Sequence, residues 1–123
     1  MPKRYLYIID DDLSFGRSLR RLLTCKGFRV DHFASAQAFL DSVPSGQKGI
    51  AIIDIHMPDI DGFTLMDKMR VLRYDMPAIM ITGQTQADSR DLALQKGAIG
   101  FLQKPFNESS LLALIEEQDK VSG

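Results

Sequence analysis

Acidic residues directly follow the first and the third of five apolar runs in this chain. Asp10, Asp11 and Asp12 follow the first run, residues 5–9, and Asp54 follows the third run, residues 50–53. Two carboxylates about 4 Å apart repel each other by about 4 kcal/mol at an effective dielectric near 20, so a cluster of Asp10, Asp11 and Asp54 would need a compensating cation. An all-carboxylate cluster without cysteine or a convergent histidine favours Mg²⁺, or Mn²⁺, over zinc.

A hydroxyl and a lysine stand at the ends of two further runs. Thr82 follows the fourth run, residues 78–81, and Lys104 lies just beyond the fifth run, residues 99–102. A Mg²⁺ ion held by carboxylates and water completes its shell with phosphate oxygens, which Thr82 and Lys104 could bond and neutralise. Singly, each residue has an ordinary explanation, such as an aspartate that caps a helix. Together they predict a site that holds a phosphoryl group.

The elements that must position these residues are short strands. Five apolar, β-branched runs predict strands over 5–9, 28–30, 50–53, 78–81 and 99–102. Longer stretches between them have helical periodicity, and strict strand-helix alternation implies a parallel sheet with right-handed crossovers and helices on both faces. The carboxyl ends of such strands share one edge, where ligands bind. This α/β arrangement therefore brings together the residues that follow the first, third, fourth and fifth strands.

Five helices are expected between and after the strands. The first has an apolar stripe and stops at Gly27, the second is capped by Ser35, and the third begins at Asp61-Gly62. Their inward positions are Phe15, Leu19, Leu22 and Leu23, then Ala36, Phe39, Leu40 and Val43, then Leu65, Met69 and Leu72. The fourth, roughly 84–96, has the weakest apolar stripe and should be loosely held. The fifth places Leu111, Leu114 and Ile115 inward.

Length and charge narrow the class of protein. With 123 residues the chain has room for one domain, 1–123. A net charge of −1 leaves no overall basic field for nucleic acid or an anionic membrane. The apolar runs fall far short of the 18 or so residues that a membrane span needs. The lone Cys25 and the absence of a signal-peptide pattern favour a cytoplasmic protein.

The motifs in this order resemble the receiver domain of two-component response regulators, the family of the bacterial chemotaxis regulator. The likeness covers nearly the whole chain, through the segments 5–12, 53–62, 82–83 and 97–106. It implies a flavodoxin-like, doubly wound sheet of five parallel strands in the order 2-1-3-4-5 with five helices. It also implies a cis bond between Lys104 and Pro105.

The resemblance assigns roles to the residues at the strand ends. Asp54 is the phosphoacceptor, which takes a phosphoryl group from a sensor histidine kinase or a histidine phosphotransferase. Asp11, Asp54 and the backbone carbonyl of His56 ligate Mg²⁺, and Asp10 assists through water. Thr82 and Lys104 contact the phosphoryl group. Such a domain is not a conventional enzyme, but it catalyses its own phosphorylation and dephosphorylation.

Other positions carry weaker implications. Thr82 and Phe101 occupy the switch positions of the family. His56 and Gln84 differ from the chemotaxis regulator at positions that tune hydrolysis of the acyl phosphate, so the lifetime of the phosphoryl group is not predicted. His32, at the end of the second strand, is expected to be a surface or packing residue. The first helix has an arginine-rich polar face where the family docks its kinase, although a solvated face is the ordinary explanation.

Three other functions fit part of the pattern. A phosphatase of the haloacid dehalogenase type would use an aspartate of the first strand end as nucleophile, but it needs a further acidic pair after the lysine strand. A flavodoxin-like electron carrier has the right topology, yet three aspartates would repel a flavin phosphate. A degenerate receiver that acts only through protein contacts is the nearest alternative. The intact acidic set with Thr82 and Lys104 counts against it.

The signal is expected to pass to a partner, because no DNA-recognition helix is predicted after the fifth helix. The block 100–106 resembles FixJ/LuxR-type transcription regulators, which favours the receiver part of a longer regulator over a stand-alone receiver. In that case the surface of the fourth helix and fifth strand, including Asp91, Gln95 and Ile99, should mediate phosphorylation-dependent homodimerisation. Asp91 would place like charges near the two-fold axis, so dimerisation should be weak.

Overall fold

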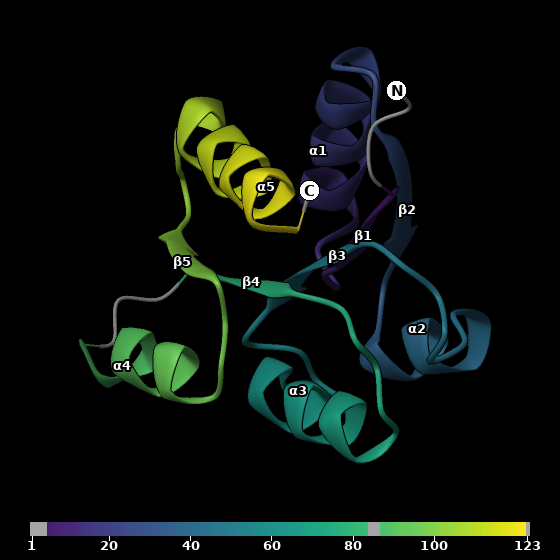
Figure 1. Ribbon diagram of the computed structural model, residues 1–123. Coiled ribbons are helices and arrows are strands. Elements are labelled where there is room, and N and C mark those ends of the chain that lie inside the picture. Colours follow the sequence, from purple (N-terminus) through teal and green to yellow (C-terminus); the bar gives the residue numbers. More distant parts are fainter. Residues whose placement is uncertain (1–4, 84–86, 123) are drawn as a thin grey trace.

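The computed structural model describes residues 5–83 and 87–122, apart from the side chains of 87 and 119–122. Strands and helices alternate along this part of the chain (Figure 1). They are β1 (Tyr5–Ile9), α1 (Leu13–Cys25), β2 (Arg29–Phe33), α2 (Ala36–Ser42), β3 (Ile50–Asp54), α3 (Gly62–Val71), β4 (Ala78–Thr82), α4 (Ala87–Gln95), β5 (Gly100–Gln103) and α5 (Glu108–Ser122). All strand pairs are parallel, in the order β2-β1-β3-β4-β5, which confirms the predicted fold class.

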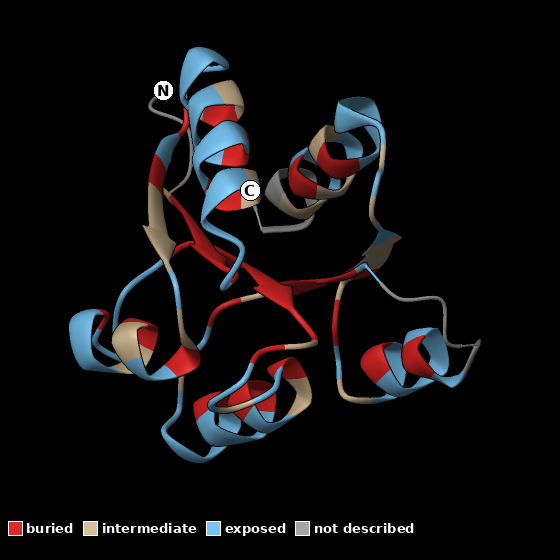
Figure 2. Ribbon diagram, turned by 180° about the vertical axis from the view of Figure 1, so that it is seen from behind, coloured by how far each residue is buried: buried red, intermediate tan, exposed pale blue. Residues whose placement is uncertain are grey.

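Helices cover both faces of the sheet. Figure 1 shows α1 and α5 on one face and α2, α3 and α4 on the other. The central strands β3 and β4 are buried along their whole length, as Figure 2 shows in red. Because helices cover both faces of these two strands, their side chains are apolar on both sides and their sequence is a near-continuous apolar run.

The sheet separates two apolar cores. The core against α1 and α5 receives from these helices Leu19, Leu23, Leu111 and Ile115. The core on the other face receives from its helices Ala36, Phe39, Leu65, Met66, Met69 and Ala93. Most of the inward positions expected from helical periodicity thus lie in a core, and together they hold the strand ends at one edge.

Side-chain caps begin three of the helices. The carboxylate of Asp12 accepts a hydrogen bond from the Phe15 amide at 3.1 Å, and Asp61 caps α3 in the same way. The hydroxyl of Ser35 caps α2, as predicted. These caps satisfy amide groups that have no partner within the helix. Asp12 therefore serves α1, whereas Asp10 and Asp11 remain at the strand edge.

Several predicted boundaries need correction. Strands β3 and β4 continue through Asp54 and Thr82, because the parallel pairing extends to Asp54 beside Ile81 and to Thr82 beside Gln103. The second strand is Arg29–Phe33 rather than 28–30, and the fifth is Gly100–Gln103 rather than 99–102. Asp54 and Thr82 are thus the last residues of their strands, which ties both backbones to the sheet.

Two helical predictions also differ. Leu72 was expected to face inward, but α3 ends at Val71, and Leu72, the residue that caps the helix end, is 51% exposed. In α4 the buried positions are Ser89 and Ala93, whereas Leu92 is exposed. The loose hold expected of this helix stays a prediction. Within the described residues, no helix has the length and apolar content to cross a membrane.

Candidate functional site

Three carboxylates meet at the carboxyl end of the sheet. Asp10 and Asp11 follow β1, and Asp54 ends the neighbouring strand β3, with Ile9 beside Ile53 in the register. One ligand atom from each of the three aspartates lies within 4.8 Å of the others. Asp10 and Asp54 are buried, whereas Asp11 is exposed. The sheet therefore assembles the acidic cluster expected from the sequence.

Lys104 joins this cluster through Asp10. Its Nζ donates to Asp10 Oδ2 at 2.7 Å and lies 4.0 Å from the ring centroid of Phe15. Its amide donates to the carbonyl oxygen of Thr82 at 2.7 Å, and the bond from Lys104 to Pro105 is cis, as expected. The lysine is thus fixed at both its backbone and its ammonium group.

The hydrogen bonds distinguish the two buried carboxylates. Asp10 Oδ2 accepts from Lys104, and Asp10 Oδ1 accepts from the Asp12 amide at 2.9 Å. Among the described residues, the one hydrogen bond to Asp54 is longer, 3.3 Å, from the His56 amide to Oδ1. Since both oxygens of Asp10 have donors, Asp54 is the carboxylate with more capacity for a new ligand or bond.

Burial and the neighbouring aspartates change the proton affinity of Asp54. Burial raises its pKa, the charge of Asp10 raises it further, and together they bring it from 3.8 to about 7 in the metal-free chain. Lys104 and the His56 amide act in the opposite direction without cancelling these effects. The charge of Lys104 is thus too little to offset three carboxylates, and the residues present fit a hard divalent cation such as Mg²⁺.

This raised pKa predicts an effect on stability. The folded chain holds the Asp54 proton more tightly than the unfolded chain, so its contribution to stability is present below pH 3.8 and is lost as the pH rises towards 7. Asp54→Asn should therefore stabilise the metal-free protein at pH 8 by on the order of 2 kcal/mol, after allowance for solvent screening. Urea unfolding without divalent ions measures this difference. A gain of equal size at pH 4.5 and pH 8 would contradict the assigned cause.

The remaining predicted residues lie around this edge or outside the described ranges. Thr82 is buried at the end of β4, and Phe101 in β5 is half-buried against the core that faces α3. His56 is half-buried next to β3, and its Nε2 is buried with no hydrogen-bond partner among the described residues. Gln84 lies outside the described residues. The ligand, switch and tuning roles of these residues stay predictions.

One contact with the acidic loop was not expected from the sequence. His32 Nε2 lies 2.8 Å from the backbone carbonyl oxygen of Asp10. Of the expected roles of His32, surface or packing, the packing one holds, because this residue of β2 is half-buried with its ring beside Gly16 of α1; in addition, the ring contacts the loop. Gly16, a glycine inside the first helix, was the available signal, because such a residue often marks a close approach.

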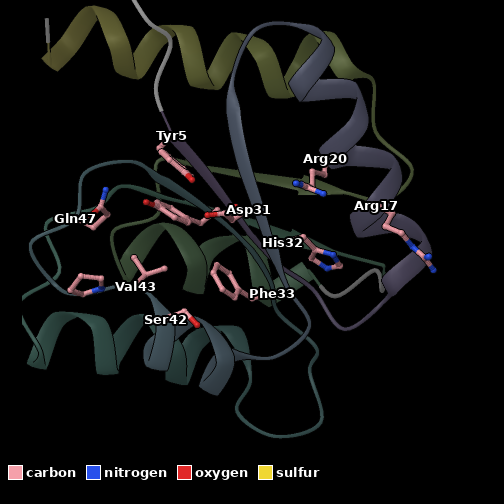
Figure 3. A pocket seen from close by; sticks show the side chains of 11 residues that line it. Tyr5, Arg17, Arg20, Asp31, His32, Phe33, Ser42, Val43 and Gln47 are labelled. Atoms are coloured by element: carbon pink, nitrogen blue, oxygen red, sulfur yellow. The ribbon is translucent and has the colours of Figure 1, made fainter.

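A hollow of about 700 Å³ lies along the outer edge of β2 (Figure 3). Tyr5, Asp31 and Phe33 line it together with Arg17 and Arg20 of α1. Arg20 Nε donates to the carbonyl oxygen of Val30 at 3.0 Å, so this arginine covers part of the edge strand. Among the three acidic-cluster residues, none lines this hollow.

Known proteins resemble this chain in sequence and in fold. The family model described as "Response regulator receiver domain" matches residues 6–116. The transcriptional regulatory protein FixJ of Bradyrhizobium diazoefficiens is 39% identical over 114 residues, which cover 93% of this chain and 56% of FixJ. The response regulator protein TmoT of Ectopseudomonas mendocina is 36% identical over 117 residues, 95% of this chain and 53% of TmoT. The chain thus spans about half the length of these curated relatives.

Solved structures agree with the sequence comparison. The crystal structure titled FixJ-N has a TM-score of 0.86 and 34% identity, and the match covers 94% of this chain and 93% of that one. Full-length FixJ from B. japonicum has a TM-score of 0.88 and 37% identity, over 98% of this chain and 59% of that one. With the match to the family model over nearly its whole length, the chain belongs to the response regulator receiver domains.

Proposed function

We propose that Asp54 is the residue that accepts the phosphoryl group in this receiver domain. Phosphoryl acceptance is the standard function of the family to which the chain belongs. The observation that carries the assignment is the contrast between the two buried carboxylates within the described part of the chain: both oxygens of Asp10 have donors there, whereas Asp54 has one long hydrogen bond. The phosphodonor would be the phosphohistidine of a sensor histidine kinase or a histidine phosphotransferase, which would act in the cytoplasm.

Mg²⁺ is the cofactor proposed for this site. Asp11, Asp54 and the backbone carbonyl of His56 would ligate it, and Asp10 would assist through water. When bound, the ion would neutralise charge on the carboxylates and on the phosphoryl oxygens. The proximity of the three carboxylates, which the charge of Lys104 offsets in part, supports the carboxylate ligands of this set.

The chain's own residues would perform the transfer. An Asp54 oxygen attacks phosphorus in line with the leaving imidazole, a new O–P bond forms, and the N–P bond of the phosphohistidine breaks. The Thr82 hydroxyl would donate to one phosphoryl oxygen, and Lys104 would neutralise another. Hydrolysis of the acyl phosphate resets the domain, and His56 and Gln84 are the proposed tuning positions.

Incubation with acetyl phosphate and Mg²⁺ tests this proposal. One phosphoryl group per chain is expected, stable in acid and labile in base, as an acyl phosphate should be. A chain that takes up no phosphoryl group would instead support a receiver that acts only by protein contacts.

Phosphorylation should change the surface of α4 and β5. A phosphoryl group that bonds Thr82 in only one conformation biases the equilibrium, and Phe101 would pack inward as Thr82 moves towards the phosphate. Because α4 buries small side chains, Ser89 and Ala93, it is the proposed moving element. Hydrogen exchange of α4 and β5 should change in the beryllofluoride complex. Identical exchange in both states would rule out this route.

The output proposed for this domain is transcription control through a C-terminal effector domain, as in relatives such as FixJ, or through a downstream partner. The α4 and β5 surface would then form a phosphorylation-dependent homodimer. Asp91 and Gln95 are exposed on α4, and Ile99 is half-buried before β5.

This dimer should be weak, because Asp91 would bring like charges together near the two-fold axis. Sedimentation of the beryllofluoride-activated chain should show a concentration-dependent dimer, and Asp91→Asn should strengthen it. A chain that remains monomeric at high concentration would favour a heterologous partner or a stand-alone receiver.

A further inference from the structure

Two hydrogen bonds tie the backbone of Asp10 to the edge strand. The Asp10 amide donates to the carbonyl oxygen of Phe33 at 3.0 Å, which continues the strand pairing. The Asp10 carbonyl oxygen instead meets a side chain, His32 Nε2, at 2.8 Å. A carbonyl only accepts, so Nε2 must carry the proton in this contact. Figure 3 places the His32 ring beside α1, the helix that carries Arg17 and Arg20.

The His32 ring fits only because α1 has a glycine beside it. A Cβ atom at Gly16 would lie 2.1 Å from Cε1 and 2.2 Å from Nε2 of His32. Glycine inside a helix is less stable than alanine by about 1 kcal/mol. The first helix therefore gives up helix stability at the one position where the ring approaches it.

The bonded carbonyl belongs to the peptide that leads into the proposed metal ligand. Since a peptide group is planar, holding the oxygen of Asp10 also fixes the amide nitrogen and Cα of Asp11. Asp11 is exposed, and no described residue donates a hydrogen bond to its carboxylate. The direction of that carboxylate thus depends mainly on its backbone.

We propose that His32 is a positioning residue for the metal site, which orients the Asp10–Asp11 peptide while Gly16 makes room for the ring. This inference rests on the proposed Mg²⁺ site. Its chemical logic is that of the outer contacts which orient metal ligands, and whose loss weakens metal binding. The competing explanation is purely structural: the ring would simply attach β2 to α1.

Two replacements of His32 separate these explanations. His32→Gln keeps an N–H donor at a similar reach, whereas His32→Leu keeps much of the volume and removes the donor. Calorimetric titration with Mg²⁺ should show about tenfold or more weaker binding for His32→Leu and affinity near that of the parent for His32→Gln. Urea unfolding without metal provides the stability of each variant. If His32→Leu binds Mg²⁺ as the parent does, the positioning role is wrong, whatever its stability.

A double-mutant cycle with Gly16 adds an independent test. Gly16→Ala should weaken Mg²⁺ binding in the parent, because the new Cβ displaces the ring, although alanine is the better helix former. In a His32→Ala background the same change should leave Mg²⁺ affinity unaltered and stabilise the fold. Equal losses of affinity in both backgrounds would show that Gly16 does not act through His32.

The same titrations distinguish a failure of the proposed Mg²⁺ site from a failure of the positioning role of His32. A parent chain that binds no Mg²⁺ would overturn the proposed metal site and this inference with it. A parent that binds Mg²⁺ together with an unaffected His32→Leu variant would overturn the inference alone. In the metal-free parent, nitrogen NMR of the imidazole should place the proton on Nε2 of His32, and a proton on Nδ1 alone would contradict the contact.

Discussion

Asp54→Asn should nearly abolish the phosphorylation of this chain by acetyl phosphate in the presence of Mg²⁺. The amide is close in size to the carboxylate but lacks the nucleophilic charge, and Asp10 cannot replace it because Lys104 and the Asp12 amide occupy both its oxygens. The expected loss is at least a hundredfold in labelling rate, the size typical of losing a group that acts at the reacting atoms. Radiolabel from a phosphorylated donor, counted per chain, measures it.

A matched control shows whether an Asp→Asn change away from the site also affects labelling. Asp75→Asn makes the same chemical change at an exposed position that precedes β4, at the opposite end of the sheet, and should label as the parent does. Full labelling of Asp54→Asn would refute the assignment. Loss of labelling in Asp10→Asn but not in Asp54→Asn would instead indicate a haloacid dehalogenase-type nucleophile.

Asp11→Ala should mainly affect metal binding, whereas Asp12→Ala should mainly affect stability. Asp11→Ala removes one of two direct carboxylate ligands, so Mg²⁺ binding should be lost at millimolar concentrations. Asp12→Ala removes the cap of α1, whose carboxylate accepts from the Phe15 amide, and should destabilise the fold by about 1 kcal/mol while Mg²⁺ still binds.

Calorimetric Mg²⁺ titration and urea unfolding, done on both variants, separate the two effects. Mg²⁺ should also raise the unfolding midpoint of Asp12→Ala, because a ligand that binds only the folded state stabilises it, and it should do nothing for Asp11→Ala. Equal losses of Mg²⁺ affinity in the two variants would mean that the ligand register is shifted by one residue.

The main elements of the site were predictable because topology does most of the positioning. Strand-helix alternation implies a parallel sheet, and a parallel sheet brings the residues after its strands to one edge. Asp10, Asp11 and Asp54 therefore meet as the sequence predicts, and Lys104 joins them. The exact strand ends mattered little, since extending β3 by one residue leaves Asp54 at the same edge.

The finer contacts were not predictable, because they depend on side-chain packing between distant elements. Nothing in the sequence indicates that Lys104 pairs with Asp10 rather than Asp54, although this choice decides which carboxylate is left with bonding capacity. Leu72 fits a helical stripe, yet the helix ends before it. The contact made by His32 depends on its ring packing against Gly16, a residue 16 positions earlier in the sequence, and this packing could not be predicted.

Chemical mapping of the phosphorylated carboxylate tests the assignment of Asp54 most directly. Borohydride reduces an acyl phosphate to an alcohol, so the labelled aspartate becomes homoserine, which peptide mass spectrometry locates. We predict homoserine at position 54 alone, in an amount that matches the phosphoryl group incorporated. Homoserine at Asp10 or Asp11, with position 54 unchanged in a fully phosphorylated chain, would contradict the assignment of the acceptor.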